Sequence, residues 1–224
     1  MPRSSDRSHR TRWGHKLRTA PGEEAALSSR ERHKLVAPVP QGRVLLHCCC
    51  APCAGEVIET LLWSEIDHAV MFYNPNIHPH DEYLRRKDEL QRFAARHGIG
   101  VVDADYDSAA WFRAVEGLEA EPERGARCTV CFDVRLERTA AHAEQHGFAM
   151  IATSLGISRL KNIGQVDACG RRAAARYAGV IHWDHDWRKS GGADRAAELA
   201  KQEQFYRQDY CGCVYSRSKL KLIS

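Results

Sequence analysis

Short apolar runs alternate with helical patterns from residue 43 to residue 205, and this alternation is what most constrains the fold. The candidate strands are Val44–His47, Ala69–Tyr73, Val101–Ala104, Ala149–Thr153 and Val180–Trp183. Helical patterns cover residues near 53–65, 81–97, 108–115, 129–146, 162–177 and 193–205. Such alternation is typical of a parallel sheet with helices on both faces. We therefore predict an α/β fold with an open, mostly parallel sheet.

The ends of the helical patterns carry their own signals. Gly98 and Gly147 follow two of the patterns, at positions where glycine commonly ends a helix. Asp81 stands at the start of the second pattern, where an aspartate can cap a helix. The apolar positions that recur at helical spacing in this pattern are Tyr83, Leu90, Phe93 and Ala94. We expect these apolar side chains to face the core.

The excess positive charge of the chain lies at the N-terminal end. Residues 1–40 hold nine basic and four acidic side chains, whereas the remainder holds 24 basic and 25 acidic ones. The N-terminal segment is polar and lacks apolar periodicity, which predicts a disordered basic tail over 1–40. Residues 41–224 are then expected to form a single α/β catalytic domain. A nucleic-acid partner would have to bind local basic patches of that domain.

The sequence lacks an apolar segment of membrane-spanning length, and its start lacks the apolar region of a secretory signal. We therefore expect a cytoplasmic protein without membrane association. This expectation bears on the cysteines, because thiols stay reduced in the cytosol.

Nine cysteines form three tight groups and one isolated residue. They occupy positions 48, 49, 50, 53, 128, 131, 169, 211 and 213. An odd count with adjacent members argues against a framework of disulfides. Metal binding or redox chemistry is the usual role of such clusters in a reducing compartment. Cys169 stands alone, and we expect it to be an ordinary buried cysteine.

Three kinds of site can use these thiols. A zinc ribbon is excluded, because 74 residues separate Cys53 from Cys128, although the fold could still assemble a zinc site. A thioredoxin-like exchanger would use Cys50 and Cys53 at a strand-to-helix junction, but it needs only one pair. An iron–sulfur cluster takes four thiolates from two segments and explains more of the cysteines.

Polar and thiol groups follow every predicted strand. In chain order they are Cys48–Cys50, Asn74–His78, Asp105 and Asp107, Ser154 and Ser158, and Asp184–Asp186. Because ligands of open α/β sheets bind beyond the carboxyl ends of the strands, we place the functional site at this edge.

Five segments between Val44 and Ser216 carry a family resemblance. They are "LLHCCCAPC", "FYNPNIHPHDEYLRR", "RCTVCFDVRLERTA", "TSLGISRLKN" and "YCGCVYS". As a set they resemble the QueH-type epoxyqueuosine reductases. The resemblance implies reduction of epoxyqueuosine to queuosine at the wobble position of tRNA, the last step of queuosine synthesis. It also implies a fold similar to the adenine-nucleotide alpha-hydrolase (HUP-like) type, a [4Fe-4S] cluster and a second mononuclear metal ion, iron or zinc.

Roles follow from the resemblance residue by residue. The implied cluster ligands are Cys49, Cys50, Cys128 and Cys131. Cys211 and Cys213 match the redox-active pair, and Cys53 is the implied ligand of the second metal. Cys48 receives no role. The partners are tRNA carrying epoxyqueuosine and an unidentified electron donor.

Further candidates rest on position alone. Removal of the epoxide oxygen needs two electrons and two protons, and His47, His78 and Asp105 are candidate proton donors. Asn76 and His78 are candidate substrate contacts. Lys161 and Asn162, which follow the fourth strand, are our preferred contacts to nucleic acid. The run Arg85-Arg86-Lys87 is a weaker candidate for binding phosphates.

Two rival functions differ in what they predict. A zinc-stabilised RNA-binding domain without catalysis would be colourless and would leave bound tRNA unchanged. A thiol–disulfide oxidoreductase would lose function with Cys50 or Cys53 alone and would tolerate Cys128→Ala.

Overall fold

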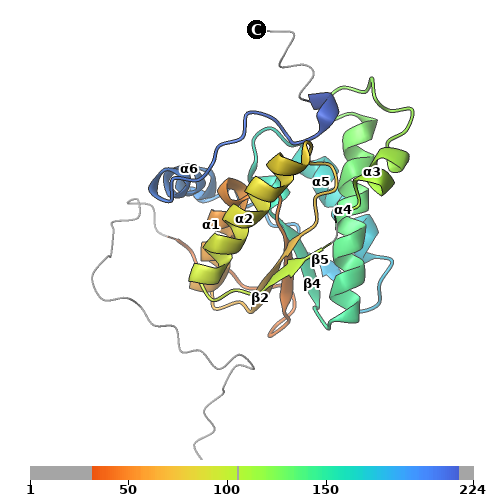
Figure 1. Cartoon of the computed structure of the whole chain (residues 1–224). Coiled ribbons are helices and arrows are strands. Elements are labelled where there is room, and N and C mark those ends of the chain that lie inside the picture. Colours follow the sequence, from red (N-terminus) through yellow and green to blue (C-terminus); the bar gives the residue numbers. More distant parts are fainter. Residues whose placement is uncertain (1–31, 105, 217–224) are drawn as a thin grey trace, which may run out of the picture.

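Within residues 32–104 and 106–216, which the computed structural model describes, five parallel strands form one open sheet (Figure 1). The strands are β1 (Val44–His47), β2 (His68–Phe72), β3 (Val101–Asp103), β4 (Met150–Thr153) and β5 (Ile181–His182). Their order is β3-β2-β1-β4-β5, and every pair is parallel. The predicted α/β class and the parallel sheet are confirmed, whereas the closer likeness to the HUP-like fold stays a prediction.

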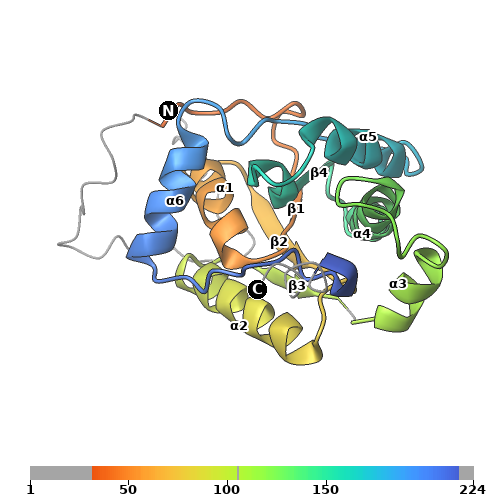
Figure 2. The same cartoon turned by 90° about the horizontal axis from the view of Figure 1, so that it is seen from above.

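Helices cover both faces of this sheet. They are α1 (Ala51–Trp63), α2 (His80–Arg96), α3 (Ser108–Ala114), α4 (Ala126–Gln145), α5 (Ile163–Ala174) and α6 (Gly192–Gln202), with a short 3-10 turn, η1 (Ser154–Ile157). In Figure 2, α1, α2 and α6 lie on one side of the strands, and α3, α4 and α5 lie on the other. None of the described helices is both long enough and apolar enough to cross a bilayer.

The strands supply both layers of the core. In β1, Val44 and Leu46 pack into the cluster of α1, α2 and α6, whereas Leu45 points to the cluster of α4 and α5. All three side chains are fully buried. Since successive side chains of a strand point to opposite faces, a strand covered on both sides must be apolar throughout. This is why the apolar runs in the sequence mark the strands.

Two expected helix ends are confirmed, and two expected helix starts are wrong. Gly98 and Gly147 follow α2 and α4 with φ of 69° and 70°, in the left-handed region that suits glycine. Pro79 occupies the N-cap of α2, so Asp81 lies in the first turn and does not cap the helix. Helix α4 begins at Ala126, three residues before the expected start, because Gly125 already has the extended backbone of an N-cap.

The packed part of the chain begins before residue 41. Arg32 pairs with Glu56 at 2.7 Å and also contacts Glu59, and Leu35 N donates to Ser64 Oγ at 3.0 Å. These contacts fasten residues 32–40 to helix α1, so the predicted boundary of the tail at residue 40 is wrong for this stretch. Residues 1–31 of the predicted tail lie outside the described residues.

Candidate metal centre and redox site

The turn from β1 into α1 brings three thiols together. The sulfur atoms of Cys49, Cys50 and Cys53 all lie within 4.8 Å of one another, and those of Cys49 and Cys50 are 3.6 Å apart. Cys50 is the N-cap of α1, so Cys53 follows one helical turn later on the same side. Convergent sulfur donors suit thiophilic metals such as zinc and the iron of iron–sulfur clusters. The residues of this turn therefore fit a metal centre.

The three thiols of this turn differ in acidity. Hydrogen bonds from Cys50 and Cys53 hold the pKa of Cys49 well below its usual range, and the charge of Arg135 adds to the effect. The same interaction with Cys49 raises the pKa of Cys50 to about 12 and raises that of Cys53. The Cys49 thiolate thus accepts hydrogen bonds from the thiols of Cys50 and Cys53. Metal binding would release the remaining protons, because thiolate is the form that binds.

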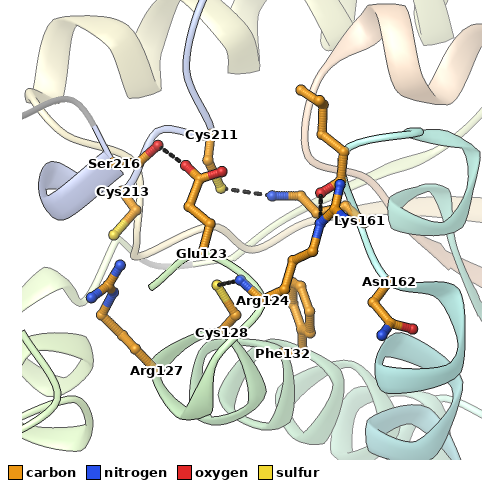
Figure 3. Close-up of a pocket in the computed structure, with 11 residues that line it drawn as sticks. Glu123, Arg124, Arg127, Cys128, Phe132, Lys161, Asn162, Cys211, Cys213 and Ser216 are labelled. Carbon is orange, nitrogen blue, oxygen red and sulfur yellow. Dashed lines mark hydrogen bonds between the residues drawn. The ribbon is translucent and has the colours of Figure 1, made fainter. Parts of the chain in front are cut away.

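The other two cysteine pairs meet on the α4 side. Cys128 and Cys131 lie in the first two turns of α4, and Cys131 packs with Cys211, Cys213 and the buried Trp111. An open pocket is lined by Cys128, Phe132, Lys161, Cys211 and Cys213 among others (Figure 3). The fold therefore brings residues near 130 and near 212 to one place. All nine cysteines are free thiols in the structure.

Lys161 makes a direct contact to Cys211, one member of the predicted redox pair. Its Nζ lies 2.8 Å from Cys211 Sγ, as the dashed line in Figure 3 shows. Burial raises the pKa of Cys211, but the charges of Lys161 and Arg135 outweigh it, and the net pKa is lowered. Burial raises the pKa of Cys213 to about 11. The pair thus consists of one sulfur prepared as a thiolate and one that holds its proton.

Arg86 holds the C-terminal segment that carries the predicted redox pair, Cys211 and Cys213. Its guanidinium donates to the carbonyls of Tyr210 and Cys211, at 3.2 Å each, and to Glu82 at 2.6 Å. Arg86 is 2% exposed, so the expectation that it binds phosphates is wrong. The sequence run around it looked like a solvated basic face because Arg85 and Lys87 are its neighbours.

The C-terminal segment also bonds to two of the strand-end loops. His78 N donates to Gly212 O at 2.8 Å, and Gln208 Nε2 donates to Cys50 Sγ at 2.8 Å. These bonds place residues 203–216 across the carboxyl edge of the sheet. Gln208 was missed by the sequence analysis, because nothing in its surroundings marks it as a partner of a cysteine 158 residues away.

His47 is a positioning group in this structure. It is fully buried, with Nδ1 2.9 Å from Thr153 Oγ1 and Nε2 3.2 Å from the carbonyl of Tyr73. Since a carbonyl only accepts, Nε2 carries the proton and Nδ1 accepts from the Thr153 hydroxyl. Burial lowers the pKa of His47 to about 3, so the neutral ring ties the ends of β1, β2 and β4 together.

The remaining predicted residues occupy different surroundings. The ring of His78 lies against Phe112 and Trp111, with centroids 4.8 Å and 5.4 Å away. Asn76 is buried, and its Oδ1 finds no partner among the described residues. Asn162 is exposed and accepts from Gln165 N at 3.2 Å as the N-cap of α5. Asp105 lies outside the described residues.

The two cysteines without an assigned role are buried in the core. Cys48 is fully buried, and its Sγ lies 3.6 Å from the Leu46 carbonyl. Cys169 is also fully buried and packs in the cluster beside α4 and α5, as expected for an ordinary core cysteine.

Comparison with known proteins agrees with this geometry. The family model described as "Epoxyqueuosine reductase QueH" matches residues 44–219. Similar curated proteins of the same name include one from Acinetobacter baylyi, 55% identical over 84% of this chain and 86% of its own length. Another, from Haemophilus influenzae, is 55% identical over 83% and 76%. One from Thermotoga maritima is 34% identical over 78% and 90%. The chain belongs to the epoxyqueuosine reductase QueH family.

Proposed function

We propose that this protein reduces epoxyqueuosine at the wobble position of tRNA to queuosine. Its relatives are named epoxyqueuosine reductase, and the family resemblance implies the tRNA substrate. The observation that carries the proposal is the gathering of thiols at one sheet edge. Cys49, Cys50 and Cys53 converge there, and the Cys211–Lys161 contact lies in the neighbouring pocket. Neither rival function gains comparable support, because a thiol exchanger or a zinc-bound RNA module needs only part of this set.

The converging thiols of Cys49, Cys50 and Cys53 fit a metal centre, and the family resemblance implies which metal groups the cysteines hold. We propose Cys49, Cys50, Cys128 and Cys131 as ligands of a [4Fe-4S] cluster and Cys53 as a ligand of a second metal ion, iron or zinc. When bound, the cluster would pass electrons singly and the second ion would act as a Lewis acid. The chain itself contributes the helix N-termini of α1 and α4, whose free N–H groups stabilise thiolates.

Oxidation of the pair Cys211 and Cys213 can supply the two electrons that the reduction needs. Conversion of the epoxide to an alkene consumes two electrons and two protons and releases water. Oxidation of the Cys211 thiolate and the Cys213 thiol to one disulfide supplies two electrons and one proton, so the second proton has to come from a separate donor. An external electron donor must then reduce the disulfide. Cys211 faces Lys161, and we propose that its thiolate is the more reactive sulfur of the pair.

The substrate has to reach this edge as an unstacked base. The pocket beside Cys211 is open at the surface, and we propose that it admits the modified base. Lys161, Asn162, Asn76 and His78 stay our candidates for substrate contacts, although Lys161 is already paired with Cys211. Asp105 stays a candidate proton donor.

A tRNA assay tests the proposal. Reconstituted protein, tRNA carrying epoxyqueuosine and a chemical reductant are incubated without oxygen, and the nucleosides are then analysed by mass spectrometry. We expect loss of one oxygen atom from epoxyqueuosine, abolished by Cys128→Ala and retained by Cys169→Ala, a buried cysteine without an assigned role. Activity that survives Cys128→Ala would favour the thiol–disulfide exchanger. Bound but unchanged tRNA with zinc-loaded protein would favour the RNA-binding module.

A further inference from the structure

A fully buried arginine lies beside the thiols, and among the described residues no carboxylate pairs with it. Arg135 is 1% exposed and follows Cys128 and Cys131 on the same side of α4, at positions i, i+3 and i+7. Its Nη2 donates to Asn74 Oδ1 at 2.5 Å, and its Nε has no partner in the described part of the chain. A buried charge that lacks an opposite charge is costly. An anion close to Arg135 would remove this cost.

The groups that face Arg135 come from three separate segments. Cys128 and Cys131 lie on its side of α4, and Asn74, which accepts from it, follows β2. The Asn74 amide also reaches the carbonyl of Cys48, which precedes Cys49 in the turn after β1. The guanidinium is therefore central to the thiol groups, and sulfur is the anion that the surroundings offer it.

Two other cations of the site, Lys161 and Arg86, have anionic partners. Lys161 contacts Cys211 Sγ at 2.8 Å, and Arg86 pairs with Glu82 at 2.6 Å. The ion pairs found within residues 32–104 and 106–216 include none that joins Arg135 to a carboxylate. Asn74 holds the guanidinium in place, and its Nδ2 donates to the carbonyl of Cys48 at 2.9 Å. This bond couples the arginine to the turn that carries Cys49 and Cys50.

We propose that Arg135 is a positioning residue whose buried charge compensates the thiolate-bound cluster and raises its reduction potential, with Asn74 fixing its place. This inference rests on the proposed function, because it requires that a cluster is bound. A nearby fixed positive charge favours the reduced state, which carries one more negative charge. The same charge would favour cluster binding over the metal-free protein.

A redox titration of the reconstituted protein, followed by electron paramagnetic resonance, tests the inference. The variants are Arg135→Gln, Arg135→Lys and the matched control Arg138→Gln, which removes an exposed arginine of the same helix. We expect a more negative midpoint potential for Arg135→Gln, a smaller shift for Arg135→Lys and none for Arg138→Gln. An unshifted potential in Arg135→Gln, or an equal shift in Arg138→Gln, would overturn the inference.

A second measurement covers the case in which Arg135→Gln does not keep the cluster. Thermal unfolding of metal-free and reconstituted protein is compared for the same variants. We expect metal-free Arg135→Gln to be at least as stable as wild type, with a smaller gain in Tm on reconstitution. A metal-free variant that is less stable than wild type would show a merely structural arginine. Wild-type protein that takes up no cluster would instead sink the proposed function.

Discussion

At the scale of single residues, the Lys161 contact makes the two sulfurs of the Cys211–Cys213 pair unequal. Lysine lowers the pKa of Cys211, whereas burial raises that of Cys213 to about 11. Because a thiolate reacts and a thiol does not, the two sulfurs should differ in their rate of alkylation.

Replacing Lys161 with Met should remove much of this difference. Loss of the ammonium raises the pKa of Cys211, and each unit of increase lowers the thiolate fraction about tenfold near neutral pH. We expect alkylation of Cys211 by iodoacetamide to slow by about tenfold for each unit by which its pKa rises. Mass spectrometry on reduced, metal-free protein measures the rate. Lys189→Met, at an exposed lysine, is the control. Equal rates at Cys211 and Cys213 in wild type would contradict the assignment.

His68 offers a test of pH dependence far from the thiols. It lies at the start of β2, where Nδ1 donates to the carbonyl of Ile66 at 2.8 Å and burial lowers its pKa. The unfolded chain then binds more protons than the folded one below a pH of about 6.5, so stability falls as the pH drops. We expect His68→Leu to show a smaller loss of urea-unfolding midpoint between neutral and mildly acidic pH. An unchanged loss would mean that His68 does not titrate on unfolding.

At the scale of elements, helix α1 carries Cys53, has Cys50 as its N-cap and is held by its contact with α6. A Cβ atom on Gly55 would stand 2.8 Å from Leu199 Cδ2 and 3.2 Å from Phe205 Cε2. Gly55→Val should therefore overpack the contact and destabilise the protein by about 1–3 kcal/mol. Urea denaturation measures this change.

Two further variants separate packing from other effects of this substitution. Gly100→Ala places a Cβ in open space and should cost little by comparison. Adding Leu199→Ala to Gly55→Val should recover part of the loss, because the shortened side chain leaves room. Additive losses in the double variant would show that the helices do not meet as described.

Whether an element can be predicted from the sequence depends on whether it is set by local patterns or by contacts between residues far apart in the chain. Strands such as β1 were predictable because burial on both faces demands apolar residues throughout. The start of α4 was missed because Gly125 follows a loop that tertiary contacts hold, with Arg127 donating to the carbonyls of Leu118, Glu119 and Glu121. The path of residues 203–216 was unpredictable, since it depends on bonds such as that from Gln208 to Cys50.

The candidate site shows the same division. The cysteine groups could be predicted from spacing and strand ends, because parallel strands bring their carboxyl ends to one edge. Arg135 could have been found from its i+7 spacing to Cys128, whereas the pairing of Lys161 with Cys211 joins segments 50 residues apart. Such side-chain pairings are set by the packed fold, which local patterns do not encode.

At the scale of the whole molecule, we propose that four segments of one chain build a single iron–sulfur site. Those segments are the turn after β1, the start of α4, the loop that carries Lys161 and the C-terminal stretch across the sheet edge. Cys49 comes from the turn after β1 and Cys128 from the start of α4, so two separate segments of the proposed site each supply one of these ligands. Loss of either should therefore have the same consequence for the metal content.

Iron and acid-labile sulfide content of anaerobically purified protein tests this claim most directly. Wild type and Cys169→Ala should both hold close to the roughly four irons and four sulfides of one cluster, with a visible absorption band. Cys49→Ala and Cys128→Ala should each lose most of both. Wild-type protein that contains zinc without iron, and stays so after reconstitution with iron and sulfide, would contradict the account.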